Sequence, residues 1–219
     1  MTMHLSNPIP CEQLLRIVKW QLFLALVVLS SATPLRAQML LPTIDVAAIQ
    51  NFNGMGTSAT ATLPTGFKIG TDWATGTTAT TQAAGTSGTG AFNGTSAGGA
   101  YNAAQGVTGT STDRSLGFLT SGNGVTGYSS PRSIILRLQN NTGQVVGSLD
   151  LAWNYEKYRS GTRQIDWSFY HGATSAPTTA DGNGDHSYPS NANNTVISNP
   201  PLSTSRTFTI SDLSIEPGG

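Results

Sequence analysis

Apolar and polar residues alternate along three runs in the second half of the chain, at 133–138, 148–156 and 164–170. Such an alternation, with a period of two, is typical of a β-strand with one buried face. The second and third runs place aromatic residues on that face, namely Trp153, Tyr155, Trp167 and Phe169. We therefore predict three strands, with Trp153 and Trp167 both buried on adjacent antiparallel strands.

The last residues, 207–219, predict one more strand and then a turn. Phe208 and Ile210 share one parity, whereas Leu213 and Ile215 have the other, which indicates a bulge near 211–212. No sequence follows that could pair with this strand. We therefore expect a module that is incomplete at its C-terminus, with an open strand edge through which the protein self-associates.

Residues 54–112 are rich in Gly, Thr, Ala and Ser, and 76–99 is close to low complexity. We expect long flexible loops that join short strands here, with a disordered linker as the alternative. Large apolar residues are few and would act as isolated anchors: Phe67, Ile69, Trp73, Phe92 and Tyr101. Since no part of the mature chain shows helical periodicity, the predicted fold is all-β. We expect an antiparallel β-sandwich of the jelly-roll type with long Gly/Thr/Ser-rich loops.

The N-terminus has the layout of a secretory signal peptide. Arg16 and Lys19 precede a short apolar run at 22–29, and small and polar residues follow as far as Ala37. The apolar run is shorter than the roughly 20 residues that span a bilayer. We predict a signal helix within 1–37, a single module over 38–219 and a secreted or cell-surface location. An uncleaved N-terminal anchor is the alternative.

Composition excludes several classes of function. Charged residues make up 10% of the chain, against about 25% in ordinary soluble proteins. From Gln38 onward, 8 Lys and Arg stand against 10 Asp and Glu, a net charge of −2, so nucleic acid is an unexpected partner. The one cysteine, Cys11, lies in the predicted signal peptide. The mature chain therefore has no disulfide and no cysteine-based metal site, and we expect no membrane span in it.

Short motifs give a resemblance. The segment 112–117 (TDRSLG), followed by Ser121-Gly122, resembles a "DRALG…SG" element of a β-sandwich module found in secreted bacterial surface and extracellular proteins. The stretch 135–172 is similar to the next portion of that module, in which a strand, an "NNTG" turn and two further strands follow one another. The opening 51–54 (NFNG) resembles its "FDG".

The chain departs from this pattern in two places. Residues 156–159 read EKYR where the module has EQWR, and the chain ends at 216–219 (EPGG) where the module continues with a further strand. The resemblance implies a jelly-roll-like module that often precedes other domains in exported proteins. It brings no catalytic residues with it.

Catalytic motifs occur only in unsuitable surroundings. Residues 94–98 fit G-x-S-x-G and residues 122–127 fit G-x-G-x-x-G, but neither lies between a strand and a helix as its chemistry requires. His171 ends a predicted strand and His186 falls in a polar loop. Asp150, Glu156 and Asp166 are expected on solvated faces. We therefore predict a protein that is not an enzyme.

Two features suggest ligands. Asp181, Asn183 and Asp185 place oxygen atoms at alternate positions, as calcium loops do, although the Glu that closes such a loop is absent. Calcium is the one cofactor considered. Tyr158 and Tyr170 fall near strand ends, where they could line a sugar-binding face.

Three functions follow from these expectations. The first is a non-catalytic exported module for adhesion or ligand binding outside the cell, with a glycan or a surface protein as partner. The second is the leader module of a larger secreted enzyme, nuclease-like or hydrolase-like. The third is a structural surface protein.

Overall fold

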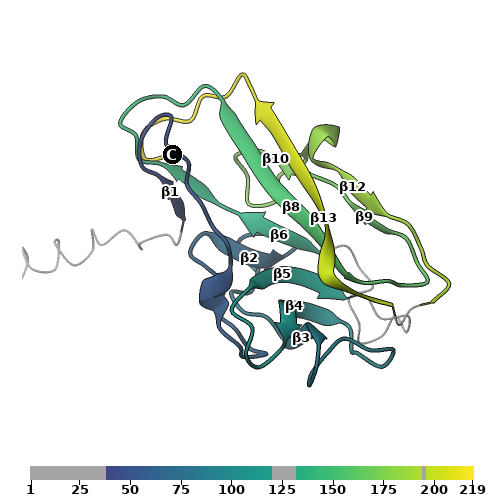
Figure 1. The fold of residues 1–219 in the computed structure, drawn as a ribbon. Helices are drawn as coiled ribbons and strands as arrows, with labels where there is room; N and C mark the ends of the chain where they lie inside the picture. Colours follow the sequence, from purple (N-terminus) through teal and green to yellow (C-terminus); the bar gives the residue numbers. More distant parts are fainter. Residues whose placement is uncertain (1–37, 120–131, 194–195) are drawn as a thin grey trace, which may run out of the picture. The chain divides into compact units, whose positions relative to one another are not determined.

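Short β-strands dominate the computed structural model, which describes residues 38–119, 132–193 and 196–219 (Figure 1). In chain order the strands are β1 (Met39–Leu41), β2 (Phe67–Gly70), β3 (Gln82–Ser87), β4 (Gly99–Val107), β5 (Arg114–Leu119), β6 (Ser133–Leu136), β7 (Leu138–Asn140), β8 (Leu149–Arg159), β9 (Ile165–Trp167), β10 (Tyr170–His171), β11 (Thr179–Ala180), β12 (His186–Tyr188) and β13 (Ile197–Ile210). Two 3₁₀ turns, η1 (Asn53–Met55) and η2 (Gly182–Gly184), are the helical elements of these residues. The all-β prediction is confirmed.

The predicted signal helix at 1–37 lies outside the described residues. Residues 38–219 make up one compact unit, which we describe by itself. Within the described ranges, no helix has the length and apolar character needed to cross a bilayer.

Pairing of the strands is mixed. β3, β4 and β5 form one sheet, in which β4 lies between a parallel β3 and an antiparallel β5. The other pairs are two-stranded: β1–β7, β2–β6, β8–β13, β9–β12 and β10–β11. Because β1 and β7 are also parallel, the expectation of purely antiparallel pairing is wrong. The loop 88–98 supplies the crossover that joins the parallel strands β3 and β4.

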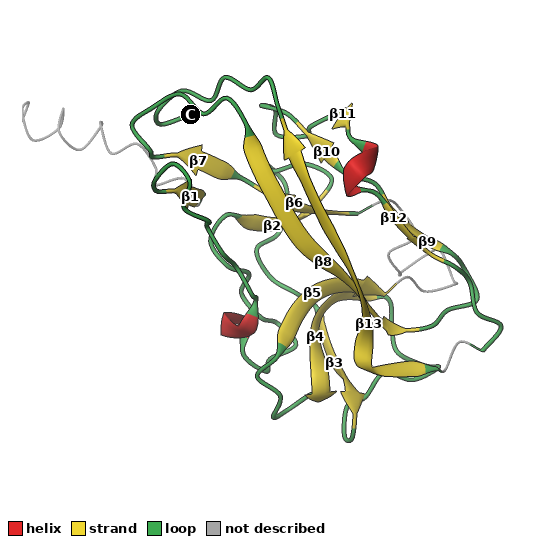
Figure 2. Ribbon diagram, turned by 45° about the horizontal axis from the view of Figure 1, so that its top comes forward, coloured by secondary structure: helices red, strands yellow, loops and turns green. Residues whose placement is uncertain are grey.

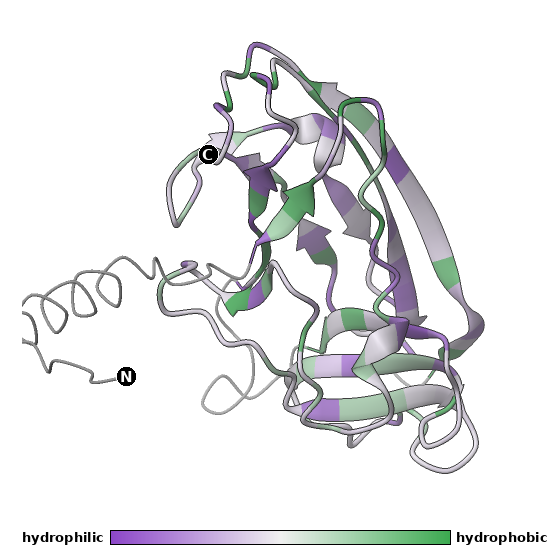
Figure 3. Cartoon of the chain, turned by 90° about the vertical axis from the view of Figure 1, so that its left-hand side faces the viewer, coloured by the Kyte–Doolittle hydropathy of each residue, from purple (hydrophilic) through white to green (hydrophobic). Residues whose placement is uncertain are grey.

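β8 and β13 form a long antiparallel ribbon (Figure 2). Along β8 half-buried and exposed side chains alternate as the sequence predicts, and hydrophobic and hydrophilic residues are interspersed along the strands (Figure 3). Trp153 and Trp167, however, are only half-buried. Their strands are not hydrogen-bonded to each other either, because β8 pairs with β13 and β9 pairs with β12. The burial prediction is wrong because a two-stranded ribbon is too narrow to cover large rings completely.

The irregularity predicted at 211–212 is present. Asp212 has a φ of 57°, in the left-handed region. Ile215 then pairs with Val146 in an antiparallel bridge. The change of parity after β13 therefore follows from a local break in the backbone, after which pairing with the same neighbouring segment resumes.

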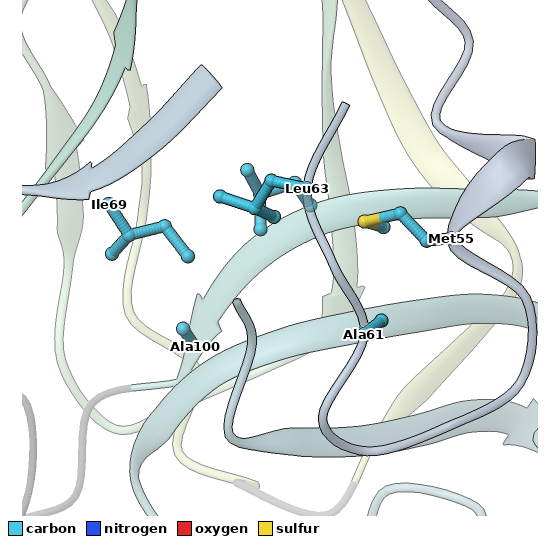
Figure 4. Packing of buried hydrophobic residues seen from close by; sticks show 6 residues of the cluster. Met55, Ala61, Leu63, Ile69 and Ala100 are labelled. Carbon is cyan, nitrogen blue, oxygen red and sulfur yellow. The ribbon is translucent and has the colours of Figure 1, made fainter. Parts of the chain in front are cut away.

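The best-buried apolar residues come from the Gly- and Thr-rich first half. One cluster contains Met55, Ala61, Leu63, Ile69, Ala100 and Leu116, five of which are labelled in Figure 4. A second contains Ala84, Phe92, Tyr101 and Ala103. The expectation that 54–112 consists of flexible loops with isolated anchors is therefore wrong. Its alanines are small enough for loop backbone to pack directly on β3 and β4, and a core of that kind has no strong hydropathy signal.

Polar side chains occupy the deepest positions. The largest fully buried side chains are Asn102, Asn140 and Thr80. The Asn102 amide donates to the carbonyl oxygens of Gly56 and Ser58, both at 3.0 Å. Thr80 Oγ1 accepts the N–H of Ala61 at 2.9 Å. These side chains supply hydrogen-bond partners to backbone groups in segments that belong to no sheet.

The segment 112–117, which carries the resemblance, contains another buried tether. Arg114 is 2% exposed. Its Nε donates to the Ser111 carbonyl at 3.0 Å and its Nη2 donates to the Thr108 carbonyl at 2.6 Å. Its backbone N–H donates to Asn53 Oδ1 at 2.9 Å. The motif segments 51–54 and 112–117 are therefore in direct contact. The hydrogen bonds of Arg114 also fix the loop that precedes β5.

The third motif segment, 140–143, is organised by Asn140. Its Nδ2 donates to the carbonyl oxygens of Gln144 and Ile215, both at 2.7 Å. Its Oδ1 accepts from the backbone N–H of Thr142 at 3.0 Å and from the Thr142 hydroxyl at 2.8 Å. Residues 140–143 (NNTG), between the first two alternating runs, are a turn signal in the sequence. The structure confirms this turn, and the buried amide has partners for both of its polar atoms.

The backbone of Asn140 also binds the last residues of the sequence. Its N–H donates to the Gly219 carbonyl at 2.9 Å, and its carbonyl accepts from Gly218 at 2.7 Å. The segment 211–215 has a partner within the chain, because it pairs with 146–147. The partner lies far back in the sequence, so no local turn signal could reveal it. Self-association through an open strand edge stays a prediction.

Candidate functional site

Aromatic rings fill the space between the β8–β13 ribbon and the β9–β12 ribbon. Trp153 contacts Phe169 and Phe208, with ring centroids 5.3 and 5.4 Å apart. Tyr155 contacts Trp167 at 5.5 Å and stacks on His186 at 5.4 Å. Pairs at these separations stabilise packing beyond the area they bury. The rings therefore fix how one ribbon lies against the other.

Hydrogen bonds connect the same two ribbons. The Tyr155 hydroxyl donates to the Gly184 carbonyl at 2.9 Å. The Tyr188 hydroxyl donates to the Tyr155 carbonyl at 2.9 Å. Gly184 is required here by space, because a Cβ at this position would lie 2.5 Å from the Cβ of Phe169.

A shallow open cleft of about 310 Å³ lies over this junction. Residues from β9, β12, β13 and the turns beside them line it: Asp166, Trp167, Ser168, Asp185, His186, Ser187 and Arg206. The register explains their arrangement. Trp167 lies opposite His186 on one face, and Asp166 lies opposite Ser187 on the other. The cleft thus combines one aromatic ring with carboxylates, hydroxyls and a guanidinium.

Arg206 determines the state of His186. The Arg206 Nη2 lies 3.0 Å from His186 Nδ1. Since a guanidinium only donates, Nδ1 accepts and the ring proton resides on Nε2. Burial, and then the charge of Arg206, lower the pKa of His186 from its ordinary value of 6.5. The imidazole is therefore held neutral.

Some donors of this group have no partner among the described residues. His186 Nε2 is buried and has no hydrogen-bond partner among the described residues. Arg206 is anchored by Nε, which donates to the Asp185 carbonyl at 2.8 Å, and by Nη1, which donates to the Ser205 carbonyl at 3.1 Å. Its Nη1 and Nη2 each keep a second N–H.

Asp166 is an exposed acceptor of the cleft. Its Oδ1 accepts from the Ser187 hydroxyl and from Gln164 Nε2, the latter at 2.7 Å. Hydrogen bonding, first from Ser187 and then from Gln164, lowers the pKa of Asp166. The side chain therefore stays ionised near neutral pH, and its Oδ2 remains available to accept.

Two of the candidate calcium ligands, Asp181 and Asp185, accept hydrogen bonds from backbone N–H groups. Asp181 Oδ1 accepts the backbone N–H of Asn183 at 2.9 Å, which caps η2. Asp185 Oδ1 accepts the N–H of Phe169 at 2.8 Å. Among the described residues, no group of three or more His, Cys, Asp or Glu could hold a metal ion. Calcium binding by Asp181, Asn183 and Asp185 stays a prediction without support from this geometry.

The two candidate tyrosines lie in different surroundings. Tyr158 packs on Phe92, with centroids 6.1 Å apart, beside the second apolar cluster. Its hydroxyl accepts from Ser115 at 2.9 Å and donates to Glu156 at 2.8 Å, and burial raises its pKa. Tyr158 therefore serves in packing. Tyr170 in β10 is 49% exposed and stays a candidate for ligand contact.

The other motifs add no site. The segment 94–98 lies in the loop before β4, where the Ser96 hydroxyl accepts from the backbone N–H of Asn93 at 2.9 Å. The segment 122–127 lies outside the described residues. Asp150 and Glu156 are exposed on the outer face of β8, as expected.

Sequence reasoning missed His186 and Arg206. His186 was expected in a polar loop, but it begins strand β12. The only local signal is the alternation of His186, Ser187 and Tyr188, which is too short to distinguish from a loop. Arg206 is the one charged residue in β13, and its partner is 20 residues away.

The neutral state of His186 predicts a pH dependence of folding stability. A histidine whose pKa is lowered in the folded protein binds its proton more readily when unfolded. Its stabilising contribution is therefore complete above about pH 6.5 and is lost as the pH falls toward the lowered folded pKa. Urea unfolding between pH 7.5 and 5 should show a decline that is smaller in His186→Gln. His171→Gln is the control and should keep the decline. Equal slopes for the parent and for His186→Gln would contradict the assignment.

Comparison of the chain with protein-family models, with curated proteins and with solved structures gave no match. A function for this protein therefore has to be argued from its own residues, above all from the cleft between the two ribbons.

Proposed function

We propose that the protein is exported and that residues 38–219 form a β-sandwich of the jelly-roll type that binds glycans outside the cell without catalysing a reaction. The observation that carries this proposal is the cleft, which Asp166, Trp167, His186 and Arg206 line together. The stacking of two ribbons through an aromatic layer supports the sandwich arrangement.

Sugars suit the chemistry of this cleft. A pyranose presents an apolar C–H face that packs on an aromatic ring, and hydroxyls at its rim that donate and accept together. Trp167 offers the ring, Asp166 offers an ionised acceptor, and Arg206 offers further N–H donors. An open and shallow cleft admits a chain of sugar units from the side. The few charges of the protein favour such a neutral ligand over a nucleic acid.

The state of the titratable groups supports binding without catalysis. A glycosidase needs one carboxylic acid with a raised pKa to protonate the leaving group. The pKa of Asp166 is lowered instead. His186 is neutral, and its Nδ1 already accepts from Arg206, which makes it a poor general base.

Export is part of the same proposal, since residues 16–37 have the features of a signal peptide. We expect the chain expressed in a bacterial host to be recovered outside the cytoplasm with an N-terminus near Gln38. N-terminal sequencing of that fraction is the measurement. Recovery of intact Met1 in the soluble cytoplasmic fraction would contradict export.

A glycan array probed with the purified chain tests the binding proposal. We expect binding to one class of glycan, which isothermal titration then quantifies for the parent and two variants. Asp166→Asn and Trp167→Ala should each weaken binding at least about tenfold, equivalent to about 1.4 kcal/mol. Asp150→Asn is the matched control, because Asp150 is an exposed carboxylate on the outer face of β8 whose Oδ1 accepts from Thr209 at 2.5 Å.

Outcomes of this experiment separate the alternatives. Asp166→Asn changes an exposed side chain and should leave the melting temperature unchanged, so a loss of binding in this variant is not explained by unfolding. If both variants still bind the glycan with the affinity of the parent, the cleft is not the binding site. Absence of binding to every glycan on the array would contradict the proposal and favour a structural surface protein.

A further inference from the structure

A second group of polar and aromatic side chains comes from β2, from the loop that follows β2 and from the segment that joins β6 to β7. Lys68 Nζ is 4.8 Å from the centroid of the Trp73 ring, and Arg137 Cζ is 5.9 Å from the same centroid. Lys68 Nζ also donates to the Trp73 carbonyl at 2.7 Å. Two cations therefore converge on one indole, and none of these three residues lines the cleft described above.

The backbone fixes this arrangement. β2 and β6 lie side by side (Figure 1), and Lys68 lies opposite Ile135 in their register. The N–H of Arg137 donates to the Gly66 carbonyl at 2.9 Å, which extends the pairing beyond β6. Lys68 and Arg137 thus occupy diagonal positions on one face of the ribbon.

The loop that carries Trp73 is also anchored. The backbone N–H of Trp73 donates to the Ser175 carbonyl at 2.7 Å. Asp72 accepts from the Ser175 hydroxyl at 2.7 Å. The backbone of Trp73 is therefore held on both sides, by Lys68 at its carbonyl and by Ser175 at its N–H.

Neither cation forms a salt bridge within the part of the chain that the structure describes. The charge of Lys68 contributes to the lowered pKa of Asp72, but the hydrogen bonds that Asp72 accepts from Ser175 and Ala74 lower it more. The carboxylate of Asp72 accepts from the hydroxyl of Ser175, in the segment between β10 and β11, and from the backbone N–H of Ala74 in its own loop. The Arg137 guanidinium is half-buried and keeps its side-chain N–H groups available.

We propose that Lys68, Trp73 and Arg137 form a binding site for an anionic sugar unit of an acidic polysaccharide. A guanidinium donates two parallel hydrogen bonds to a carboxylate or a sulfate group, and an ammonium adds a second charge. The indole supplies the surface on which the sugar ring packs. Because the mature chain has a net charge of −2, binding of a polyanion depends on this local group and not on the overall charge of the protein.

Titration of the purified chain with hexagalacturonate and with a heparin-derived hexasaccharide tests the site. We expect binding of at least one of the two, a change in Trp73 fluorescence, and weaker binding as NaCl is raised from 50 to 200 mM. Arg137→Gln and Lys68→Gln should each weaken binding about tenfold or more. Trp73→Phe should keep a ring at the site but remove the fluorescence change.

Lys157→Gln is the matched control. Lys157 Nζ lies 5.6 Å from the centroid of the Tyr188 ring, so this pair has the same chemistry on another ribbon. The control should keep the parent affinity. Thermal melting of each variant shows whether the fold is retained.

Each other outcome would overturn the proposal. If Lys157→Gln lost as much affinity for the oligosaccharides as Arg137→Gln and Lys68→Gln, the effect would come from overall charge and not from this site. Inorganic sulfate that binds as tightly as the oligosaccharides would show a site for a free anion, and tighter binding of single-stranded DNA would show a nucleic-acid site. The two proposed sites can be tested independently of each other. Asp166→Asn should not change the affinity for these acidic probes, and Arg137→Gln should not change the affinity for a neutral glycan.

Discussion

Hydrogen bonds from buried polar side chains to loop backbone are the interactions on which this fold depends. Most of the described strands are short and lie in two-stranded pairs, so regular pairing leaves much of the backbone without a partner. A backbone polar group that is buried without a hydrogen bond costs about 1–3 kcal/mol. Asn102, Arg114 and Asn140 supply those bonds, each to two carbonyl groups of the neighbouring segments. Small apolar residues then let the tethered loops approach the strands closely.

The candidate sites follow from the same construction. Narrow ribbons leave aromatic side chains half-buried, so rings such as Trp167 and Trp73 are held by packing and yet stay partly exposed. Polar residues beside them are fixed by backbone contacts, as Arg206 is by the Asp185 carbonyl. Rings and donors positioned in this way are preorganised, which lowers the entropic cost of binding a ligand. The fold thus favours shallow recognition surfaces over deep pockets.

The sequence predicted the strands of the second half because their alternation extends over enough residues. It also located the break at 211–212 and the turn at 140–143. It failed where local pattern is absent. The core formed by Ala100 and its neighbours is invisible to hydropathy, and the pairing of 211–215 with 146–147 depends on contacts distant in sequence. For the same reason His186 and Arg206, which meet across two ribbons, escaped prediction, whereas the expectation that Asp166 lies on a solvated face is confirmed.

The stability of Asn140→Ala tests the central claim most directly. This substitution removes the donors to the carbonyls of Gln144 and Ile215 and the acceptor for the N–H and hydroxyl of Thr142, at a side chain that is fully buried. Urea unfolding at neutral pH should show a loss of at least about 3 kcal/mol. Asn141→Ala, at the exposed neighbouring position, should change the free energy of unfolding by less than about 0.5 kcal/mol. A loss below about 1 kcal/mol in Asn140→Ala, or equal losses in the two variants, would contradict the view that buried polar tethers hold this fold together.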